Sequence, residues 1–448
     1  GQCGVNAVTA QVALHQAARE IFDQALLAVD PIKPLRRAIN FDGKSVSICG
    51  TQFDITTRPV YVVAIGKAAP LMAITVGEIL KPILKGGIVS GPYCEGLKQL
   101  ESSTWSVFEG GHPLPNEASL AAAQAAFDLL RRAKEAHALV IFLVSGGGSA
   151  MLEWPRNEGI SLSDFRETNR QLTTCGASIT EINTIRRALS AVKGGRLGAI
   201  VENTDQFTLI ISDTNRGDEA SVASGPTLSP LGDGPRPGAV MDRYGLRVSL
   251  PASVVTSVEE AEKDNPFKAV NRYQVLLDNQ NAIEAAATAA RQLGFAVEVA
   301  QDVNEQPIEE GVSILISRLI SLKEKSPHNR VCLISGGEFS CVVRGTGVGG
   351  RNLETVLRCA IELDRNQHRL SFKHFVALSA GTDGLDGNSP AAGAIADENS
   401  IARAVALGLD AVRVLQNSDA FNLFSPLGDA IITGPTGTNV RDLRILIA

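Results

Sequence analysis

Two apolar runs of the chain end in nearly the same glycine-rich turn: Leu143-Val144-Ser145-Gly146-Gly147-Gly148-Ser149 and Leu333-Ile334-Ser335-Gly336-Gly337-Glu338-Phe339. Each turn is typical of the carboxyl end of a parallel strand. Glycines there remove the Cβ atoms that would keep a phosphate or carboxylate from reaching backbone N–H groups, and open α/β sheets bind ligands at that edge. A Ser-Gly-Gly turn can also be only a tight connection. Finding it twice favours a chain that binds anions.

Short apolar, β-branched runs alternate with segments of helical composition along most of the chain. A first helix is expected over 10–29. The first alternating series then has strands at 61–65, 87–89, 138–144 and 207–211, with helices over 68–84, 117–136 and 179–201. This βαβ pattern predicts a parallel sheet.

A second alternating series follows a segment rich in Pro, Gly and Asp, 228–237, which is expected to be a loop near a domain boundary. It has strands at 273–277, 296–299, 331–334, 375–378 and 443–446, with helices over 282–293, 308–322, 352–363 and 400–407. Single cores stop growing at roughly 250–300 residues. We therefore expect a two-domain α/β protein: a larger, Rossmann-like N-terminal domain with a parallel sheet over 1–265, and a smaller α/β domain over 266–448, meeting at their strand ends.

Composition excludes several classes of protein. The net charge of −6 gives no sign of a nucleic-acid partner. No apolar stretch approaches the roughly 18 residues that cross a bilayer, and the N-terminal segment lacks a signal pattern, so we expect a cytoplasmic protein with no membrane partner. The seven cysteines are odd in number and include no Cys-x-x-Cys pair, which indicates reduced thiols.

Lys67 is the first candidate for chemistry, because Gly66-Lys67-Ala68-Ala69 directly follows the run 61–65. It should lie where a strand passes into a helix N-terminus. An ammonium there adds a mobile positive charge to backbone donors and the helix dipole, which suits phosphate. A lysine extended along the surface is the alternative. No Walker A pattern occurs, so an ATP-using protein with this sequence would not be a P-loop enzyme.

Two further segments offer polar or basic side chains. The loop Gly110-Gly111-His112-Pro113 is stiffened by proline, and His112 could contact a ligand or be structural. Asn183, Arg186 and Lys193 fall close to one face of the helix expected over 179–201. This basic stripe would face anions, although solvated helix charge gives the same pattern.

Carboxylates follow two of the expected strands. Asp213 comes just after 207–211, and Asp383 and Asp386 stand among glycines just after 375–378. A strand-terminal aspartate is placed to hold Mg²⁺ or to accept a proton from a hydroxyl. We therefore expect all three as metal positions and Asp213 also as a catalytic base; helix capping is the alternative.

One glycine-rich segment satisfies G-x-G-x-x-G with Gly345, Gly347 and Gly350. In a Rossmann unit the ribose-binding acid ends the next strand about 20 residues on, whereas the acids at that distance here, Glu362 and Asp364, end the following helix. We therefore discount NAD. Gly350 with Arg351 at a helix start would still suit a phosphate or carboxylate, through a bidentate guanidinium.

Several of these segments together resemble the glycerate 2-kinase (class II glycerate kinase) family. They are 64–68, 110–113, 144–150, 183–187 with 193–195, 224–227 and 349–352. The tail, 433–443, resembles that family's C-terminal MOFRL domain. The match runs from about residue 10 to the end in the family's order. One loop departs from it, since Thr214-Asn215-Arg216 stands where small apolar residues are expected, which leaves the role of that loop open.

The resemblance implies ATP-dependent phosphorylation of D-glycerate at the 2-hydroxyl, giving 2-phosphoglycerate, with Mg²⁺ or another divalent cation and an active site between the domains. In that family the residues matching Lys67 and Arg351 are the active-site pair. The turn of Ser145, Gly146, Gly147, Gly148 and Ser149 would bind phosphate or substrate. The resemblance leaves the oligomeric state open, with a homodimer as one option.

Two other functions are compatible with these residues: an NAD(P)H-dependent hydroxypyruvate reductase, and a non-catalytic sugar-acid binding protein of the same fold. A hydride site would require a placed His or Tyr acid. The chain has six histidines and four tyrosines, of which His112 alone stands in a motif. Phosphoryl transfer requires mainly positioning and charge neutralisation, which glycine turns, Lys, Arg and carboxylates supply. The kinase is therefore favoured.

Overall fold

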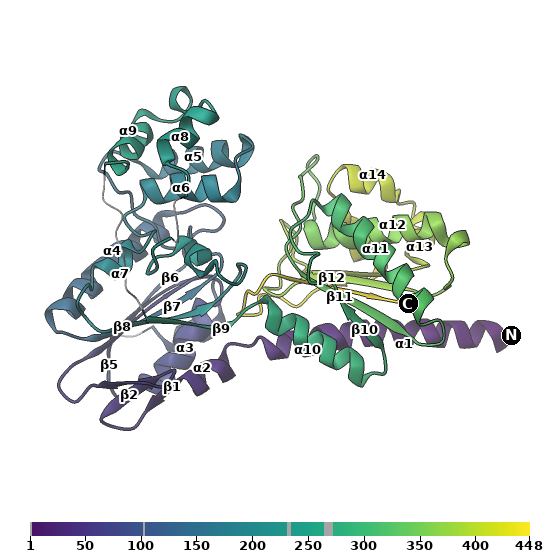
Figure 1. Cartoon of the computed structure of the whole chain (residues 1–448), viewed down its shortest axis with the longest axis horizontal. Coiled ribbons are helices and arrows are strands. Elements are labelled where there is room, and N and C mark those ends of the chain that lie inside the picture. The colour runs from purple at the N-terminus through teal and green to yellow at the C-terminus, as the bar shows by residue number, and fades with distance from the viewer. Residues whose placement is uncertain (1, 102–103, 231–233, 264–271) are drawn as a thin grey trace. The chain divides into compact units, whose positions relative to one another are not determined.

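The computed structural model describes residues 2–101, 104–230, 234–263 and 272–448 (Figure 1). The chain divides into two compact units. The N-terminal unit contains the described residues of Pro31–Leu277. The C-terminal unit contains those of Asp278–Ala448 together with those of Gly1–Asp30.

Six parallel strands form the centre of the N-terminal unit, in the order β6-β5-β4-β7-β8-β9. They are β4 (Val60–Ile65), β5 (Leu84–Ser90), β6 (Trp105–Phe108), β7 (Leu139–Ser145), β8 (Gln206–Ile211) and β9 (Arg272–Leu277). Every residue of β4 and β7 is buried, as in a sheet covered on both faces. The predicted Rossmann-like parallel sheet is confirmed. Its strand order reverses between β4 and β7, which is where such sheets bind ligands.

The other elements of this unit surround the sheet. Helix α4 packs on one face of it, where its alanines and leucines meet Tyr61, Val63 and Ile65. Helices α5, α6, α8 and α9 form a separate cluster with its own apolar core (Figure 1). The bounds are α2 (Ile32–Ala38), β1 (Ile39–Phe41), β2 (Ser45–Ile48), β3 (Thr51–Asp54), α3 (Ala69–Leu80), α4 (Glu117–Glu135), α5 (Leu162–Thr174), α6 (Ile179–Leu189), α7 (Arg196–Ala199), α8 (Pro237–Arg243) and α9 (Ala252–Ala261).

The single helix expected over 179–201 is wrong in its second half. Helix α6 ends at Leu189, because Ser190 takes extended backbone and its hydroxyl accepts from the backbone N–H groups of Val192 and Lys193. Gly194 and Gly195 then adopt positive φ, and only the short α7 follows. Lys193 therefore does not share a helix face with Asn183 and Arg186.

The C-terminal unit has a mixed sheet in the order β10-β11-β15-β12-β13-β14. The last strand, β15, is central and antiparallel to both of its neighbours. The strands are β10 (Ala296–Val299), β11 (Val331–Gly337), β12 (Val376–Gly381), β13 (Gly393–Asp397), β14 (Ala430–Ile431) and β15 (Asp442–Ile447). The helices are α10 (Asn279–Gln292), α11 (Ile308–Lys325), α12 (Arg351–Asn366), α13 (Ser400–Ala406), α14 (Ala411–Gln416) and α15 (Ala420–Leu427).

The first helix, α1 (Gln2–Ala28), packs on the C-terminal unit, where Ile21 and Phe22 join the core of α10 and the mixed sheet (Figure 1). Strand β9, expected to open the second domain, is instead the edge strand of the first sheet. Apolar periodicity shows that a face is buried but not against which core. The expected boundary between 265 and 266 lies in 264–271, outside the described residues.

Two further expectations concern membrane-spanning helices and the state of the cysteines. Among the residues that the structure describes, none of the helices combines the length and the hydropathy needed to span a bilayer. The cysteines whose side chains are described are free thiols: Cys49, Cys94, Cys175, Cys332, Cys341 and Cys359.

Candidate active site

Lys67 lies in the turn between β4 and α3, at the point where the strand order reverses. Its backbone N–H donates to the carbonyl of Gly146 at 2.9 Å. The next N–H, of Ala68, donates to Ser145 Oγ at 3.0 Å, and this hydroxyl donates to the carbonyl of Ile65 at 3.3 Å. Ser145 is fully buried, and these bonds join the Lys67 turn to the end of β7. It is not among the described residues that line the cavity beside Gly147.

The glycines of this turn allow an unusually close approach. A Cβ on Gly147, whose φ is +79°, would lie 2.8 Å from Cγ of Lys67. A Cβ on Gly66 would lie 2.4 Å from the carbonyl oxygen of Ser145, and one on Gly148 would lie 2.8 Å from Cβ of Ala223. The side chain of Lys67 therefore lies along Gly147, and the glycines position Lys67 in addition to exposing backbone donors.

A cavity of about 230 Å³ opens beside Gly147. Its lining comes from the 112–115 loop, the glycine turn, α5, α6 and the segment after α6. Five residues expected from the sequence to bind an anion line it together: His112, Gly147, Ser149, Arg186 and Lys193. Asn183 lies half-buried on α6, outside the lining formed by the described residues.

Arg186 is a half-buried cation that lines this cavity. Its Nε donates to Asn169 Oδ1 at 2.8 Å, which fixes the plane of the guanidinium. None of the described carboxylates lies within ion-pair distance of it. Burial lowers the pKa of the Arg186 guanidinium from its usual value. An anionic ligand would relieve this uncompensated burial of charge.

Lys193 and Glu153 form a buried ion pair at the edge of the same cavity, each about 3% exposed. The second carboxylate oxygen of Glu153 accepts from Ser190 Oγ at 2.5 Å. Burial lowers the pKa of the Lys193 amine to about 7. Burial therefore favours the neutral amine, whereas the carboxylate of Glu153 favours the ammonium.

The described residues contain no cluster of three or more His, Cys, Asp or Glu side chains able to hold a metal ion. Mg²⁺ in phosphoryl-transfer enzymes keeps several waters and is bound through one or two carboxylates and the substrate phosphates. A single carboxylate at a strand end fits that mode. Asp213 is half-buried just after β8, and its role as a metal position stays a prediction.

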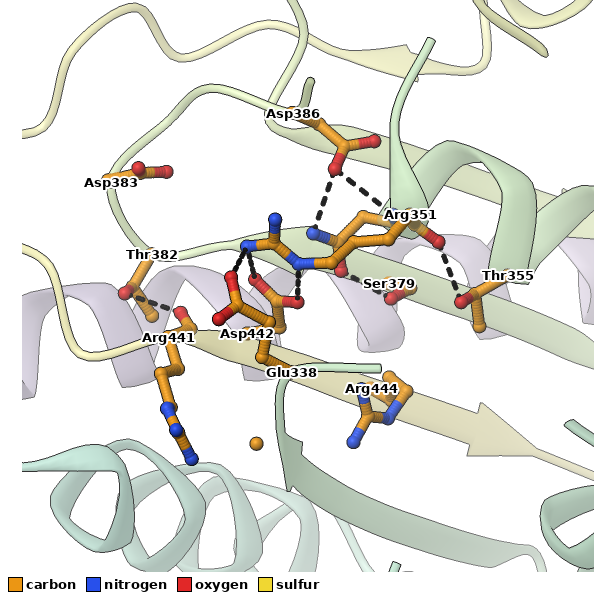
Figure 2. A network of polar contacts seen from close by, with 12 residues as sticks. Glu338, Arg351, Thr355, Ser379, Thr382, Asp383, Asp386, Arg441, Asp442 and Arg444 are labelled. Atoms are coloured by element: carbon orange, nitrogen blue, oxygen red, sulfur yellow. Dashed lines mark hydrogen bonds and ion pairs between the residues drawn. The ribbon is translucent and has the colours of Figure 1, made fainter. Parts of the chain in front are cut away.

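In the C-terminal unit, Arg351 opens α12 within a polar network (Figure 2). Its Nε donates to Asp442 Oδ2 at 2.6 Å and its Nη2 to Oδ1 at 3.0 Å, while Glu338 Oε1 lies 2.5 Å from Nη2. Burial alone would lower the pKa of Arg351, but the two carboxylates outweigh it and raise the pKa well above the usual value.

Asp386 caps α12 and does not face solvent. Its carboxylate accepts from the backbone N–H groups of Asn352 and Leu353 at 3.0 and 2.9 Å. A Cβ on Gly350 would lie 2.5 Å from the Asp386 carboxyl carbon, so Gly350 permits this approach. Burial raises the pKa of Asp386 to about 6. The structure thus gives Asp386 the capping role left open from the sequence. Asp383 is half-buried and accepts from Leu385 N–H at 3.1 Å.

The G-x-G-x-x-G segment is occupied by contacts within the protein. Thr346 N–H donates to Asn417 Oδ1 at 3.2 Å, and Gly347 N–H to the Asn417 carbonyl at 3.0 Å. Val348 N–H donates to Asp419 Oδ1 at 2.8 Å. These three backbone donors are therefore used within the protein.

Sequence reasoning missed several residues of these sites: Glu153, Thr168, Asn169, Glu338 and Asp442. Glu153 and Glu338 closely follow the two glycine turns, and Asp442 stands in the family-like tail, so each had a positional signal. Thr168 and Asn169 lie on α5 in a segment without a motif.

Comparison with known proteins places the chain in a defined family. Residues 17–259 match a domain of unknown function, DUF4147, and residues 331–442 match the MOFRL family. A glycerate 2-kinase of Pyrococcus horikoshii is 32% identical, over 97% of each chain. An Agrobacterium vitis protein whose name proposes hydroxypyruvate reductase activity is 31% identical, over 97% of this chain and 95% of its own. The crystal structure of a Thermotoga maritima glycerate kinase superposes with a TM-score of 0.76 at 32% identity, covering 97% of this chain and 99% of that one.

Proposed function

Because this chain belongs to the DUF4147–MOFRL family, we propose that it is an ATP-dependent glycerate 2-kinase, which phosphorylates D-glycerate at the 2-hydroxyl. The observation that carries the proposal is the cavity beside Gly147, where Arg186 and Lys193 offer cationic groups next to the Lys67 turn. The relatives named as glycerate kinases, similar over nearly the whole chain, support the same activity.

The N-terminal unit supplies the groups that bind the acid and the phosphoryl group. In the proposal, Arg186 and Lys193 bind the carboxylate of glycerate. The ammonium of Lys67, at the N-terminus of α3, neutralises charge on the transferred phosphoryl group together with backbone N–H groups of the glycine turn. Positioning and charge neutralisation are most of what phosphoryl transfer requires of a protein.

The transfer forms a bond between the 2-hydroxyl oxygen and the γ-phosphorus, breaks the bond to ADP, and releases the hydroxyl proton. We assign Asp213 as the base or as the Mg²⁺ position, since it closely follows β8, the strand next to β7. Mg²⁺ would neutralise the nucleotide phosphates when bound. Arg351 enters the proposal only through its resemblance to the active-site arginine of the family.

A hydroxypyruvate reductase is the second candidate, favoured by the name of the Agrobacterium relative. In the G-x-G-x-x-G segment, the backbone N–H groups of Thr346, Gly347 and Val348 already bond within the protein, so they are not available to a dinucleotide.

Two assays on the purified chain separate these candidates. The first measures ADP release from ATP and Mg²⁺ with D-glycerate, and the second measures NADH or NADPH oxidation with hydroxypyruvate. The kinase predicts turnover only in the first, with K67A at least about 100-fold slower. K81A is the matched control, because Lys81 is exposed at the other end of α3. Turnover only in the second assay would overturn the proposal.

A further inference from the structure

Thr168 carries a buried hydroxyl that the protein leaves unused. The residue is 2% exposed and lines the cavity that also contains Arg186. Its Oγ1 has no hydrogen-bond partner in the described part of the chain. Buried polar atoms are almost always paired, and this hydroxyl, which is shielded from solvent in its present rotamer, reaches a ligand in the cavity only if its side chain turns.

Neighbouring threonines show that the helix itself could satisfy such a hydroxyl. Thr173 and Thr174, also on α5, donate to backbone carbonyls four residues earlier, at 3.0 and 2.9 Å. Thr184 on α6 makes the same bond at 3.0 Å. Thr168 does not make it. Threonine on a helix has two accessible χ1 rotamers, so a change of rotamer can turn the hydroxyl toward the cavity.

The surroundings of Thr168 define the chemistry of the partner. Phe165, Thr168 and Asn169 lie on one face of α5 and line the cavity together. Asn169 holds Nε of Arg186 at 2.8 Å, and no described residue accepts from the two terminal nitrogens of that guanidinium. The wall therefore presents a fixed guanidinium, which suits a carboxylate. The residue next to the asparagine that holds it carries an unpaired hydroxyl, which suits an alcohol.

We propose that Thr168 is a specificity-determining residue that hydrogen-bonds the non-reacting hydroxyl of a short hydroxy acid whose carboxylate Arg186 binds. With the proposed kinase activity, on which this rests, that group is the 3-hydroxyl of D-glycerate. The site thereby discriminates against acids such as D-lactate that lack this hydroxyl, because an absent partner leaves Thr168 unpaired.

The test compares T168V, which keeps the shape and removes the hydroxyl, with T168S, which keeps the hydroxyl. T173V on the same helix is the control, since Thr173 is exposed and bonded to the backbone. For each variant, KM and kcat for D-glycerate, the inhibition constant of D-lactate and the thermal unfolding temperature are measured. We expect T168V to raise KM about 10- to 100-fold with kcat nearly unchanged, and to leave D-lactate inhibition unchanged. T168S should restore KM to within about threefold, and T173V should behave as wild type.

Three outcomes would overturn the inference. An unchanged KM in T168V would mean that water or nothing satisfies the hydroxyl. Equal loss of D-glycerate and D-lactate affinity would indicate altered packing, and so would a T168S variant that fails to recover. If the wild-type chain transfers no phosphoryl group, the proposed function fails separately. Calorimetric titration of D-glycerate into wild type and T168V then still tests the contact, and equal affinities would refute it.

Discussion

Asp442 holds the guanidinium of Arg351 through two parallel hydrogen bonds, of 2.6 and 3.0 Å. The two residues are unequal in exposure. Asp442 is 1% exposed at the start of the central strand β15, whereas Glu338, the other acid on Arg351, is 43% exposed. An anion that binds Arg351 would therefore displace Glu338 more easily than Asp442. Asp442 therefore sets the position and orientation of the Arg351 guanidinium.

Replacing Asp442 by Asn should therefore reduce kcat more than it changes KM. The amide keeps the shape of the carboxylate but loses the charge-assisted fork, so Arg351 becomes less well oriented. We expect kcat to fall about 10- to 100-fold, with KM changed by less than about threefold. Steady-state kinetics below the unfolding temperature measure both constants. R365A, an exposed arginine on α12, is the control, and a D442N variant with wild-type kcat would refute the positioning role.

Replacing Gly147 by Ala should disable Lys67. The new Cβ would lie 2.8 Å from Cγ of Lys67, and the positive φ adds backbone strain. The matched control is G176A, because Gly176 has φ +88° and open space around its Cβ position. Both variants should lose about 1 kcal/mol in the free energy of unfolding through the positive φ, and G147A should lose more through the clash with Lys67. Only G147A should lose about 10-fold or more in kcat. Equal kcat values in the two variants would contradict the claim that Gly147 positions Lys67.

The affinity for glycerate should fall as pH rises through about 7, because burial lowers the pKa of Lys193 to about 7 and its positive charge is then lost. In E153Q the carboxylate that favours the ammonium is gone, so the pKa falls further and the loss moves to lower pH. The check is KM measured from about pH 5.5 to about pH 8.5 in both proteins. Superimposable profiles would show that Lys193 does not bind the substrate as a cation.

The amine of Lys193 also predicts that the free energy of unfolding depends on pH. The pKa of an unfolded lysine is about 10.5, so between about 7 and 10.5 the unfolded chain binds more protons than the folded chain. The contribution of Lys193 to the free energy of unfolding therefore rises with pH across that window. K193M should flatten this part of the dependence, as followed by urea unfolding at several pH values.

Removing the Asp386 cap should destabilise the C-terminal unit without changing the Mg²⁺ requirement. D386A leaves the N–H groups of Asn352 and Leu353 unpaired and buried, which costs about 2 kcal/mol or more. D410A is the control, since Asp410 caps α14 in the same way at an exposed site. Thermal unfolding and Mg²⁺ titration of activity give the two readouts. A higher Mg²⁺ requirement in D386A alone would make Asp386 a metal position instead.

The ends of β4, β7 and β11 could be predicted from the sequence because each joins two independent signals, an apolar β-branched run and a glycine turn. Lys67 and Arg351 lie at helix starts, as their neighbouring glycines indicated. The helix ends at Leu189 because Ser190 bonds the backbone of Lys193, which helical composition does not show. The Gly194-Gly195 pair was a local signal that the helix does not continue to residue 201.

Partners from distant segments could not be predicted either. The roles of Asn169 and Asp442 depend on Arg186 and Arg351, which are brought to them only by the folded chain. The placement of α1 depends on which apolar face it meets. The Asp386 cap had a local signal, but a carboxylate among glycines after a strand is equally typical of a metal ligand.

The most direct test of the central claim is the identity of the product formed from ATP, Mg²⁺ and D-glycerate, resolved by phosphorus NMR. The wild-type chain and K81A should yield 2-phosphoglycerate, and K67A should yield little in the same time. Formation of 3-phosphoglycerate would contradict the assigned hydroxyl. No phosphate ester at all, with NADH consumed in the presence of hydroxypyruvate, would contradict the kinase.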